Sequence, residues 1–192
     1  MELDNLNSKR MKTMKRKKWA VFISGTGSNL AAILDCRSDI DVVLVVSSTR
    51  KAYGCLRARR EGVPCYVMKN KEDWTSVQER LVESGVELIF LAGFMRIVPA
   101  PFLKKWEGRM ANVHPSLLPE FPGTHSIERA FERGSPLGVT IHEVIAEVDQ
   151  GPTILQRRSP SLKSESDSEF LVHLNEHRMV REVVLKWNAA QT

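Results

Sequence analysis

The sequence has few cysteines and no long apolar run. Its 192 residues include three cysteines, an odd number that lacks the spacing of a metal site. We therefore expect reduced thiols, no disulfide framework and no bound metal. No apolar stretch approaches the roughly 20 residues that a membrane helix needs, and Met1–Lys18 lacks the apolar centre of a secretory signal. These absences predict a cytoplasmic protein that makes no use of a membrane.

Most of the chain also lacks an excess of either charge. The formal net charge is +5, but seven of the 28 Lys and Arg residues lie in Met1–Lys18, beside only two of the 23 acidic residues. The remaining residues therefore carry 21 charges of each sign. We interpret residues 1–18 as a basic disordered tail, although such a tail could also contact RNA or a membrane surface. Residues 19–192 are enough for a single domain.

Apolar runs alternate with segments of helical spacing along this domain. Five short runs predict strands at residues 19–23, 42–47, 63–68, 86–92 and 109–114. The intervening spacing predicts helices at residues 30–34, 53–61, 71–84 and 101–106, and a further helix that begins at 124 or 126 and ends at 133. This alternation indicates an α/β fold with a Rossmann-like, mostly parallel twisted sheet and helices on both of its faces.

The last part of the chain departs from that alternation. Two strands predicted at residues 138–144 and 153–158 are close enough in sequence to pair antiparallel, as an addition to the sheet. A long helix is then predicted at residues 166–187. Its buried stripe is expected to comprise Phe170, Leu171, Leu174, Val180, Val183, Val184 and Trp187.

Asn112 and His114 lie two residues apart at the end of a predicted strand. On an extended backbone their side chains share one face, and Pro115 ends the strand because it donates no ladder hydrogen bond. An amide and an imidazole held side by side can donate hydrogen bonds to an oxygen that gains negative charge. The alternative is that neighbouring backbone groups satisfy both side chains.

A glycine turn follows the first strand. The segment Ser24-Gly25-Thr26-Gly27-Ser28-Asn29 leads from that strand into a helix, with Ser28 or Asn29 as the expected N-cap. Such a layout can direct backbone N–H groups at a phosphate. Leu30 stands where a dinucleotide fingerprint has its third glycine, so we expect one phosphate group rather than a dinucleotide. A plain tight turn would fit equally well.

A third candidate segment, Gly93–Pro99, follows the most apolar strand. Ligands of open α/β sheets bind beyond the carboxyl ends of the strands. Apolar and cationic residues in this segment would suit a flat, partly charged ligand. The alternative is a loop that packs Phe94 and Ile97 on the core.

Four motifs in this order are typical of one family. They are Ser24–Leu30, Leu91–Arg96, Asn112–Pro119 and Val148-Asp149-Gln150-Gly151-Pro152. From about Trp19 to Trp187 the chain closely resembles the phosphoribosylglycinamide formyltransferases, which use 10-formyltetrahydrofolate in purine biosynthesis. The resemblance implies the formyltransferase fold and a direct attack of the glycinamide amine on the formyl carbon.

The resemblance also implies roles for individual residues. Asn112 and His114 would stabilise the oxyanion, and Asp149 would pair with His114 and assist proton transfer. Taken alone, Asp149 could equally be an ordinary turn residue before Gly-Pro. Phosphoribosylglycinamide would be bound by Gly25, Thr26, Gly27, Ser28, Asn29 and Glu176. The folate would be bound by Met95, Arg96, Ile97, Val98, Asn112, Val144, Ile145, Ala146, Glu147 and Val148. His125 and His142 would be supporting residues.

The implied partners are these two small molecules, with no metal, no membrane and no nucleic acid, for a monomer or homodimer. The chain departs from the family in a shorter segment at 71–85, where Trp74 falls near the family's basic contact to the folate tail and Lys71 is a candidate replacement. Glu120 stands where the family often has a basic or neutral residue. The usual last strand is also missing after Trp187.

Three other functions remain open. A 10-formyltetrahydrofolate hydrolase would share the catalytic residues, but water needs no phosphate turn. A methionyl-tRNA formyltransferase would need a C-terminal RNA-binding module, for which no residues remain. A non-catalytic nucleotide- or RNA-binding domain would depend on the basic tail, and the complete set of Asn112, His114 and Asp149 argues against it.

Overall fold

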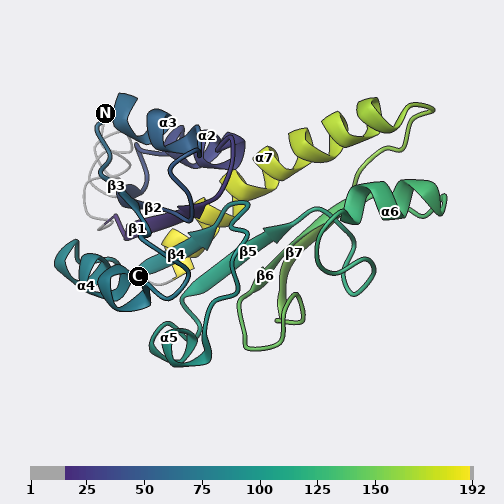
Figure 1. The fold of residues 1–192 in the computed structure, drawn as a ribbon. Coiled ribbons are helices and arrows are strands. Elements are labelled where there is room, and N and C mark those ends of the chain that lie inside the picture. Colours follow the sequence, from purple (N-terminus) through teal and green to yellow (C-terminus); the bar gives the residue numbers. More distant parts are fainter. Residues whose placement is uncertain (1–15, 191–192) are drawn as a thin grey trace, which may run out of the picture.

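The computed structural model describes residues 16–190, which form a seven-stranded sheet (Figure 1). Its strands are β1 (Lys18–Ile23), β2 (Asp41–Ser47), β3 (Cys65–Val67), β4 (Leu88–Leu91), β5 (Met110–His114), β6 (Gly138–Glu143) and β7 (Thr153–Arg158). They lie in the order β3-β2-β1-β4-β5-β6-β7. The first five are parallel, while β6 runs antiparallel to β5, and β7 runs antiparallel to β6. The predicted fold class is confirmed.

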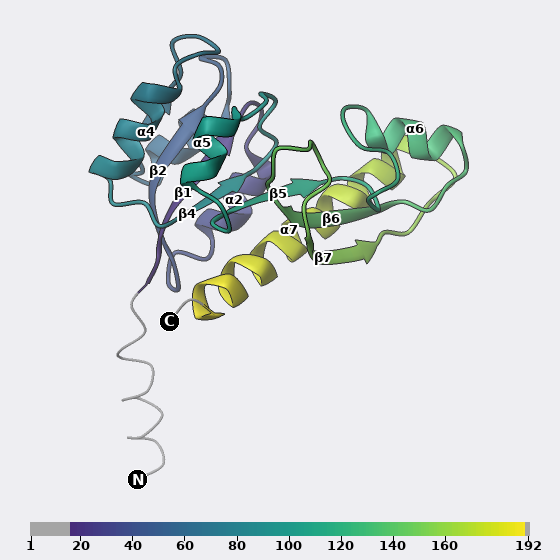
Figure 2. The same cartoon turned by 90° about the horizontal axis from the view of Figure 1, so that it is seen from below.

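Helices cover both faces of the sheet. They are α2 (Ser28–Leu34), α3 (Gly54–Arg60), α4 (Trp74–Glu83), α5 (Ala100–Lys105), α6 (Ser126–Glu132) and α7 (Glu165–Ala190). Helices α2, α3 and α7 lie on one face, and α4 and α5 lie on the other (Figures 1 and 2). Trp19, Val21 and Ile23 of β1 pack on the first side, and Ala20 and Phe22 on the second. Burial on both sides explains why the central strands β1 and β4 are almost entirely apolar.

The long helix α7 follows the predicted buried stripe in its second half, at Val180, Val183 and Val184, but departs from it in its first half. Phe170 and Leu174 are 66% and 36% exposed, so their expected burial is wrong. The buried apolar residues of α7 are Val172, Met179, Val180, Val183 and Val184. Two polar residues, Ser168 and Glu176, also lie on the buried face. The pattern of apolar residues therefore predicts the buried face correctly in the second half of α7 and wrongly in the first half, where polar residues share that face.

The start of the sheet overlaps the predicted tail. Lys18 is the first residue of β1, and Lys17 forms an ion pair with Glu87 (Nζ–Oε1 3.2 Å). Residues 1–15 of that tail lie outside the described residues, so its disorder stays a prediction. In the described part of the chain, no helix is both long and apolar enough to cross a bilayer.

Candidate active site

A cavity of about 480 Å³ opens at the carboxyl ends of β1, β4 and β5. Parallel strands bring these ends to one edge of the sheet, where ligands of such folds bind. Except for Lys71, every site residue expected from the sequence lines this cavity: Gly25, Thr26, Gly27, Ser28, Asn29, Met95, Arg96, Ile97, Val98, Asn112, His114, His125, His142, Val144, Ile145, Ala146, Glu147, Val148, Asp149 and Glu176. The structure thus brings together residues that are far apart in the sequence.

Asn112 contacts His142 across the β5–β6 pair. The antiparallel register puts these two residues directly opposite each other, and Asn112 Nδ2 lies 3.2 Å from His142 Nε2. The other ring nitrogen, Nδ1, donates to the carbonyl oxygen of Glu143 at 2.8 Å. In a neutral ring Nε2 then accepts from the amide of Asn112, whereas in an imidazolium Nε2 carries the proton that faces Asp149. One N–H of that amide remains for a ligand.

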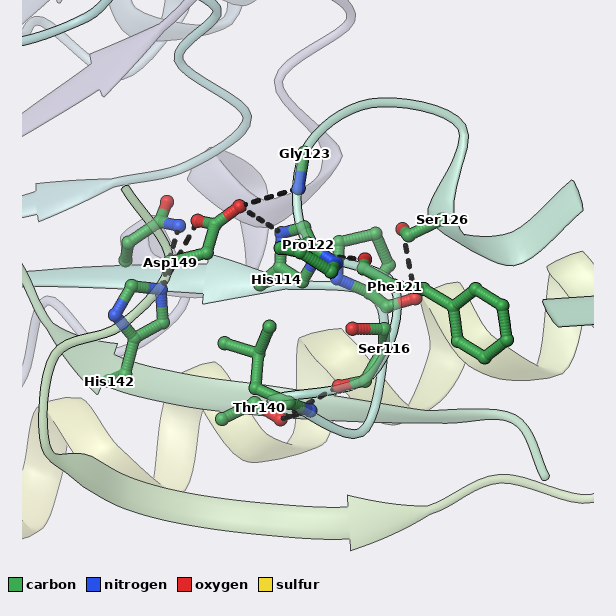
Figure 3. Close-up of polar contacts among 12 residues, drawn as sticks. His114, Ser116, Phe121, Pro122, Gly123, Ser126, Thr140, His142 and Asp149 are labelled. Carbon is green, nitrogen blue, oxygen red and sulfur yellow. Dashed lines mark hydrogen bonds and ion pairs between the residues drawn. The ribbon is translucent and has the colours of Figure 1, made fainter. Parts of the chain in front are cut away.

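His114 is buried between two hydrogen-bond acceptors (Figure 3). Its Nε2 lies 3.0 Å from the carbonyl oxygen of Phe121, and its Nδ1 lies 3.5 Å from Asp149 Oδ2. A neutral imidazole can donate to only one of them, whereas an imidazolium can donate to both. The expected pairing of His114 with Asp149 is present. The contact with Phe121 gave no signal in the sequence, because it depends on how the following loop folds back.

Asp149 is held as a carboxylate by three groups. Its Oδ1 lies 3.6 Å from His142 Nε2, and its Oδ2 accepts from the N–H of Gly123 at 2.8 Å. The interaction with His142 is the largest cause that lowers the pKa of Asp149, to about 2; Gly123 and the nearby His114 act in the same direction, against the effect of burial. Asp149 is therefore ionised throughout the neutral range, beside two imidazole rings.

The glycine turn ends in a left-handed residue instead of a side-chain cap. Gly27 has φ +73° and precedes α2, and neither Ser28 nor Asn29 caps the helix as expected. A Cβ atom on Gly27 would lie 2.7 Å from the Cα atom of Gly54, so the turn and α3 are packed backbone to backbone. Asn29 is 7% exposed, and its Oδ1 has no hydrogen-bond partner among the described residues.

Glu176 lines the same cavity from α7, which lies on the same face of the sheet as α2 and α3 (Figure 1). It is only 4% exposed, and its Oε2 lies 2.6 Å from Nδ1 of His173, which also lines the cavity. The hydrogen bond to Glu176 is the largest cause of a raised pKa of His173, and Glu169 acts in the same direction. Sequence reasoning missed His173, although its position three residues before Glu176 is a signal for contact on a helix.

The remaining lining residues divide into exposed and anchored ones. Met95 and Ile97 are 66% and 79% exposed at the mouth of the cavity. The Arg96 guanidinium instead donates to the carbonyl oxygens of Ser48 and Asn70, so its side chain ties the loop to the ends of β2 and β3.

The two sequence alternatives for this loop each describe part of it. Phe94 packs edge-on against Phe22 (5.3 Å between ring centroids), as a core-packing loop requires, while Ile97 stays exposed.

Two candidates lie at the margin of the site. His125 is exposed and pairs with Glu128 (Nδ1–Oε2 3.0 Å), away from the histidines that contact Asp149. Lys71 is exposed, pairs with Glu72 (Nζ–Oε1 3.6 Å) and does not line the cavity. Within residues 16–190 no group of three or more His, Cys, Asp or Glu side chains is arranged to hold a metal ion.

Comparisons with known proteins agree on one family. The chain matches the formyl transferase family over residues 17–184. It is 37% identical to the phosphoribosylglycinamide formyltransferase of Haemophilus influenzae, in an alignment that covers 89% of this chain and 86% of that protein. It is 40% identical to the trifunctional purine biosynthetic protein adenosine-3 of Drosophila melanogaster over 88% of this chain, but spans only 14% of that protein's length. The crystal structure of phosphoribosylglycinamide formyltransferase from Anaplasma phagocytophilum has a TM-score of 0.89 at 34% identity, covering 92% of this chain and 89% of that chain.

Proposed function

Because the chain belongs to the formyl transferase family, we propose that it transfers the formyl group of 10-formyltetrahydrofolate to the amine of phosphoribosylglycinamide, in purine biosynthesis. The observation that carries the proposal is the convergence of Asn112, His114 and Asp149 on the cavity that the glycine turn also lines. An oxyanion site beside a phosphate site suits a reaction in which a phosphorylated amine attacks a carbonyl carbon.

The nucleotide would lie between the glycine turn and α7. The backbone N–H groups of Gly25 to Asn29 suit a phosphate, because they are donors without charge or bulk. The carboxylate of Glu176 suits the hydroxyl and amino groups of the same ligand, and its contact with His173 fixes its orientation. Both sets of residues line the one cavity, which supports this placement.

The folate would lie at the mouth of the cavity. Met95, Ile97 and Val148 line the cavity with exposed apolar side chains, which suit a flat ring. The backbone of Arg96 and of residues 144–148 supplies polar groups for the edge of the pterin, whereas the Arg96 side chain is already engaged with Ser48 and Asn70. The fit therefore depends on main-chain groups rather than on a charged side chain.

In the proposed reaction the amine nitrogen bonds to the formyl carbon and the carbonyl oxygen becomes an oxyanion. The second N–H of Asn112 donates to that oxygen. His114 donates to it through Nδ1, because Nε2 is held by the carbonyl of Phe121 and the 3.5 Å contact of Nδ1 with Asp149 is longer than an ordinary hydrogen bond. The bond from the formyl carbon to N10 then breaks, and the proton lost by the amine ends on N10. With a pKa near 2, Asp149 is a weak base. Its main role is then to orient the ring of His114 through Nδ1, and any proton that it relays passes only transiently.

One incubation tests this function. The purified full chain is mixed with 10-formyltetrahydrofolate, with and without phosphoribosylglycinamide, and the products are identified by mass. We expect formylated nucleotide and tetrahydrofolate in equal amounts. When the nucleotide is omitted, we expect little loss of the formyl group from 10-formyltetrahydrofolate. Equal loss of the formyl group in both mixtures would identify a hydrolase. If neither mixture loses the formyl group, the protein is a binding domain without this activity.

A further inference from the structure

Two residues of α3 hold the carbonyl oxygens of the glycine turn. The N–H of Gly54 donates to the carbonyl oxygen of Gly25 at 3.2 Å, and Nε of Arg57 donates to that of Thr26 at 2.9 Å. The next carbonyl, of Gly27, accepts from Ala31 at 3.0 Å inside α2. The carbonyl groups of Gly25 and Thr26 are therefore held by α3, and that of Gly27 is held by α2.

These contacts determine where the N–H groups of the turn point. In a trans peptide the C=O of one residue and the N–H of the next point in opposite directions. Holding the carbonyls of Gly25 and Thr26 toward α3 therefore turns the N–H groups of Thr26 and Gly27 the other way. Both residues line the cavity, and no hydrogen-bond acceptor for either N–H occurs among the described residues. Successive N–H groups of this kind form an anion-binding concavity.

A second observation indicates that the turn faces a ligand. Asn29 adjoins it, is more than nine-tenths buried and lines the same cavity, and its buried Oδ1 lacks a hydrogen-bond partner among residues 16–190. Such an oxygen is costly unless a ligand supplies a donor. Free N–H donors beside an unsatisfied acceptor match a phosphate ester that also carries a hydroxyl group.

Arg57 itself is fixed against the turn. Its Cδ atom would lie 3.5 Å from a Cβ atom on Gly27, so its stem runs along the glycine backbone. Its guanidinium lies 5.1 Å from the centre of the Tyr53 ring, in the range of a cation–π contact. A side chain held at both its stem and its head can keep the carbonyl of Thr26 in one orientation.

We propose that Arg57 is a positioning residue for the substrate phosphate. It acts through the carbonyl of Thr26 and does not touch the ligand, so it affects binding of the nucleotide and leaves the formyl-transfer chemistry unchanged. The inference rests on the proposed function for the identity of the nucleotide. The orientation of the turn follows from the contacts of Gly54 and Arg57 alone.

The test uses Arg57→Met, which keeps the stem and removes the donor and the charge. We expect KM for phosphoribosylglycinamide to rise about tenfold, the usual effect of losing one charge-assisted hydrogen bond. We expect kcat and KM for the folate to stay within about twofold, because neither depends on the phosphate. Arg57→Lys, which retains a charged donor, should give a smaller rise of about threefold. Arg60→Met is the matched control, since Arg60 is exposed on the same helix and has no described contact with the turn.

A binding measurement separates this inference from the proposed function. Ribose 5-phosphate carries the phosphate and ribose but no amine, so calorimetric titration with it needs no formyl transfer. We expect its Kd to rise about tenfold in Arg57→Met and to stay unchanged in Arg60→Met. Equal Kd values for Arg57→Met and the wild type, or no binding to the wild type, would overturn the role of Arg57 even in an active enzyme. If Arg57→Met lowered kcat by the same factor as kcat/KM, that result would also overturn the proposed role. If Arg57→Met does not fold, the result for Arg57→Lys decides, and wild-type affinity would refute the proposal.

Discussion

Asp149 has an unusual backbone conformation, and its side chain lies beside the buried ring of His114. Asp149 has φ 57°, a left-handed conformation that costs a residue with a side chain roughly 1 kcal/mol. This conformation places the carboxylate between the rings of His114 and His142, where it also accepts from the N–H of Gly123. The loop therefore positions a charge at the cost of local strain, as binding and catalytic loops commonly do.

At this scale the sequence predicted residue identities better than contacts. The spacing of Asn112 and His114 predicted that their side chains share one face of a strand, and the family resemblance predicted Asp149 as their partner. Neither source could give the Phe121 carbonyl at His114 Nε2 or the Ser48 and Asn70 carbonyls at Arg96. Main-chain acceptors carry no sequence signature, so the partners of these two side chains follow only from the fold of distant loops.

Replacing Asp149 should change the acid sensitivity of the fold. Since its pKa is lowered from 3.8 to about 2, the carboxylate stabilises the folded state fully above about pH 4, and that contribution is lost as the pH falls through 2. We expect Asp149→Asn to lower the free energy of unfolding by roughly 1–2 kcal/mol at pH 6, and the difference to shrink toward pH 2. Urea unfolding at several pH values measures it, with Glu147→Gln, an exposed carboxylate of the same loop, as control. A deficit of equal size at every pH would contradict the assigned pKa.

Helix α7 shows how one element serves both the core and the site. Val172, Met179 and Val183 pack on the sheet, while Glu176 on the same buried face lines the cavity. A carboxylate within an apolar stripe looks like an interruption of the stripe when only the sequence is read. In the first half of α7 the buried face becomes clear only when Ser168 and Glu176 are counted as buried, which requires the tertiary structure.

The pair of His173 and Glu176 should make the stability of α7 depend on pH. The pKa of His173 is raised above its ordinary value of 6.5, so the ion pair stabilises the fold fully below pH 6.5 and this contribution is lost as the pH rises through the folded pKa. We expect His173→Gln to lower Tm by about 2 °C at pH 6, allowing for the partial exposure of the ring, and by less at pH 9.

The control for that experiment is a second pair with the same spacing. His125 and Glu128 of α6 lie at the same i,i+3 spacing but are exposed, with 74% and 53% of their side chains accessible. Exposed pairs contribute little, so Glu128→Gln should leave Tm almost unchanged at both pH values. A Tm loss in His173→Gln that is the same at pH 6 and pH 9 would show that the ring acts only by packing.

On the scale of the whole molecule, the strand order explains the site. Placing β1, β4 and β5 side by side brings the glycine turn, the 93–98 loop and Asn112 to one edge. The antiparallel β6 then sets His142 opposite Asn112, and the loop before β7 returns Asp149 to His114. Alternation of strands and helices in the sequence predicted the sheet and its antiparallel addition. It could not predict the strand order or the register, because these depend on long-range pairing.

The central claim is that His114 from β5 and Asp149 from a distant loop act as one catalytic unit. A double-mutant cycle on kcat for formyl transfer tests it most directly. We expect His114→Ala and Asp149→Asn each to lower kcat at least about a hundredfold. The double variant should lie within about fivefold of the slower single variant, since a unit can be lost only once. Turnover within a few-fold of the wild type in either single variant, or losses that multiply in the double variant, would contradict the claim.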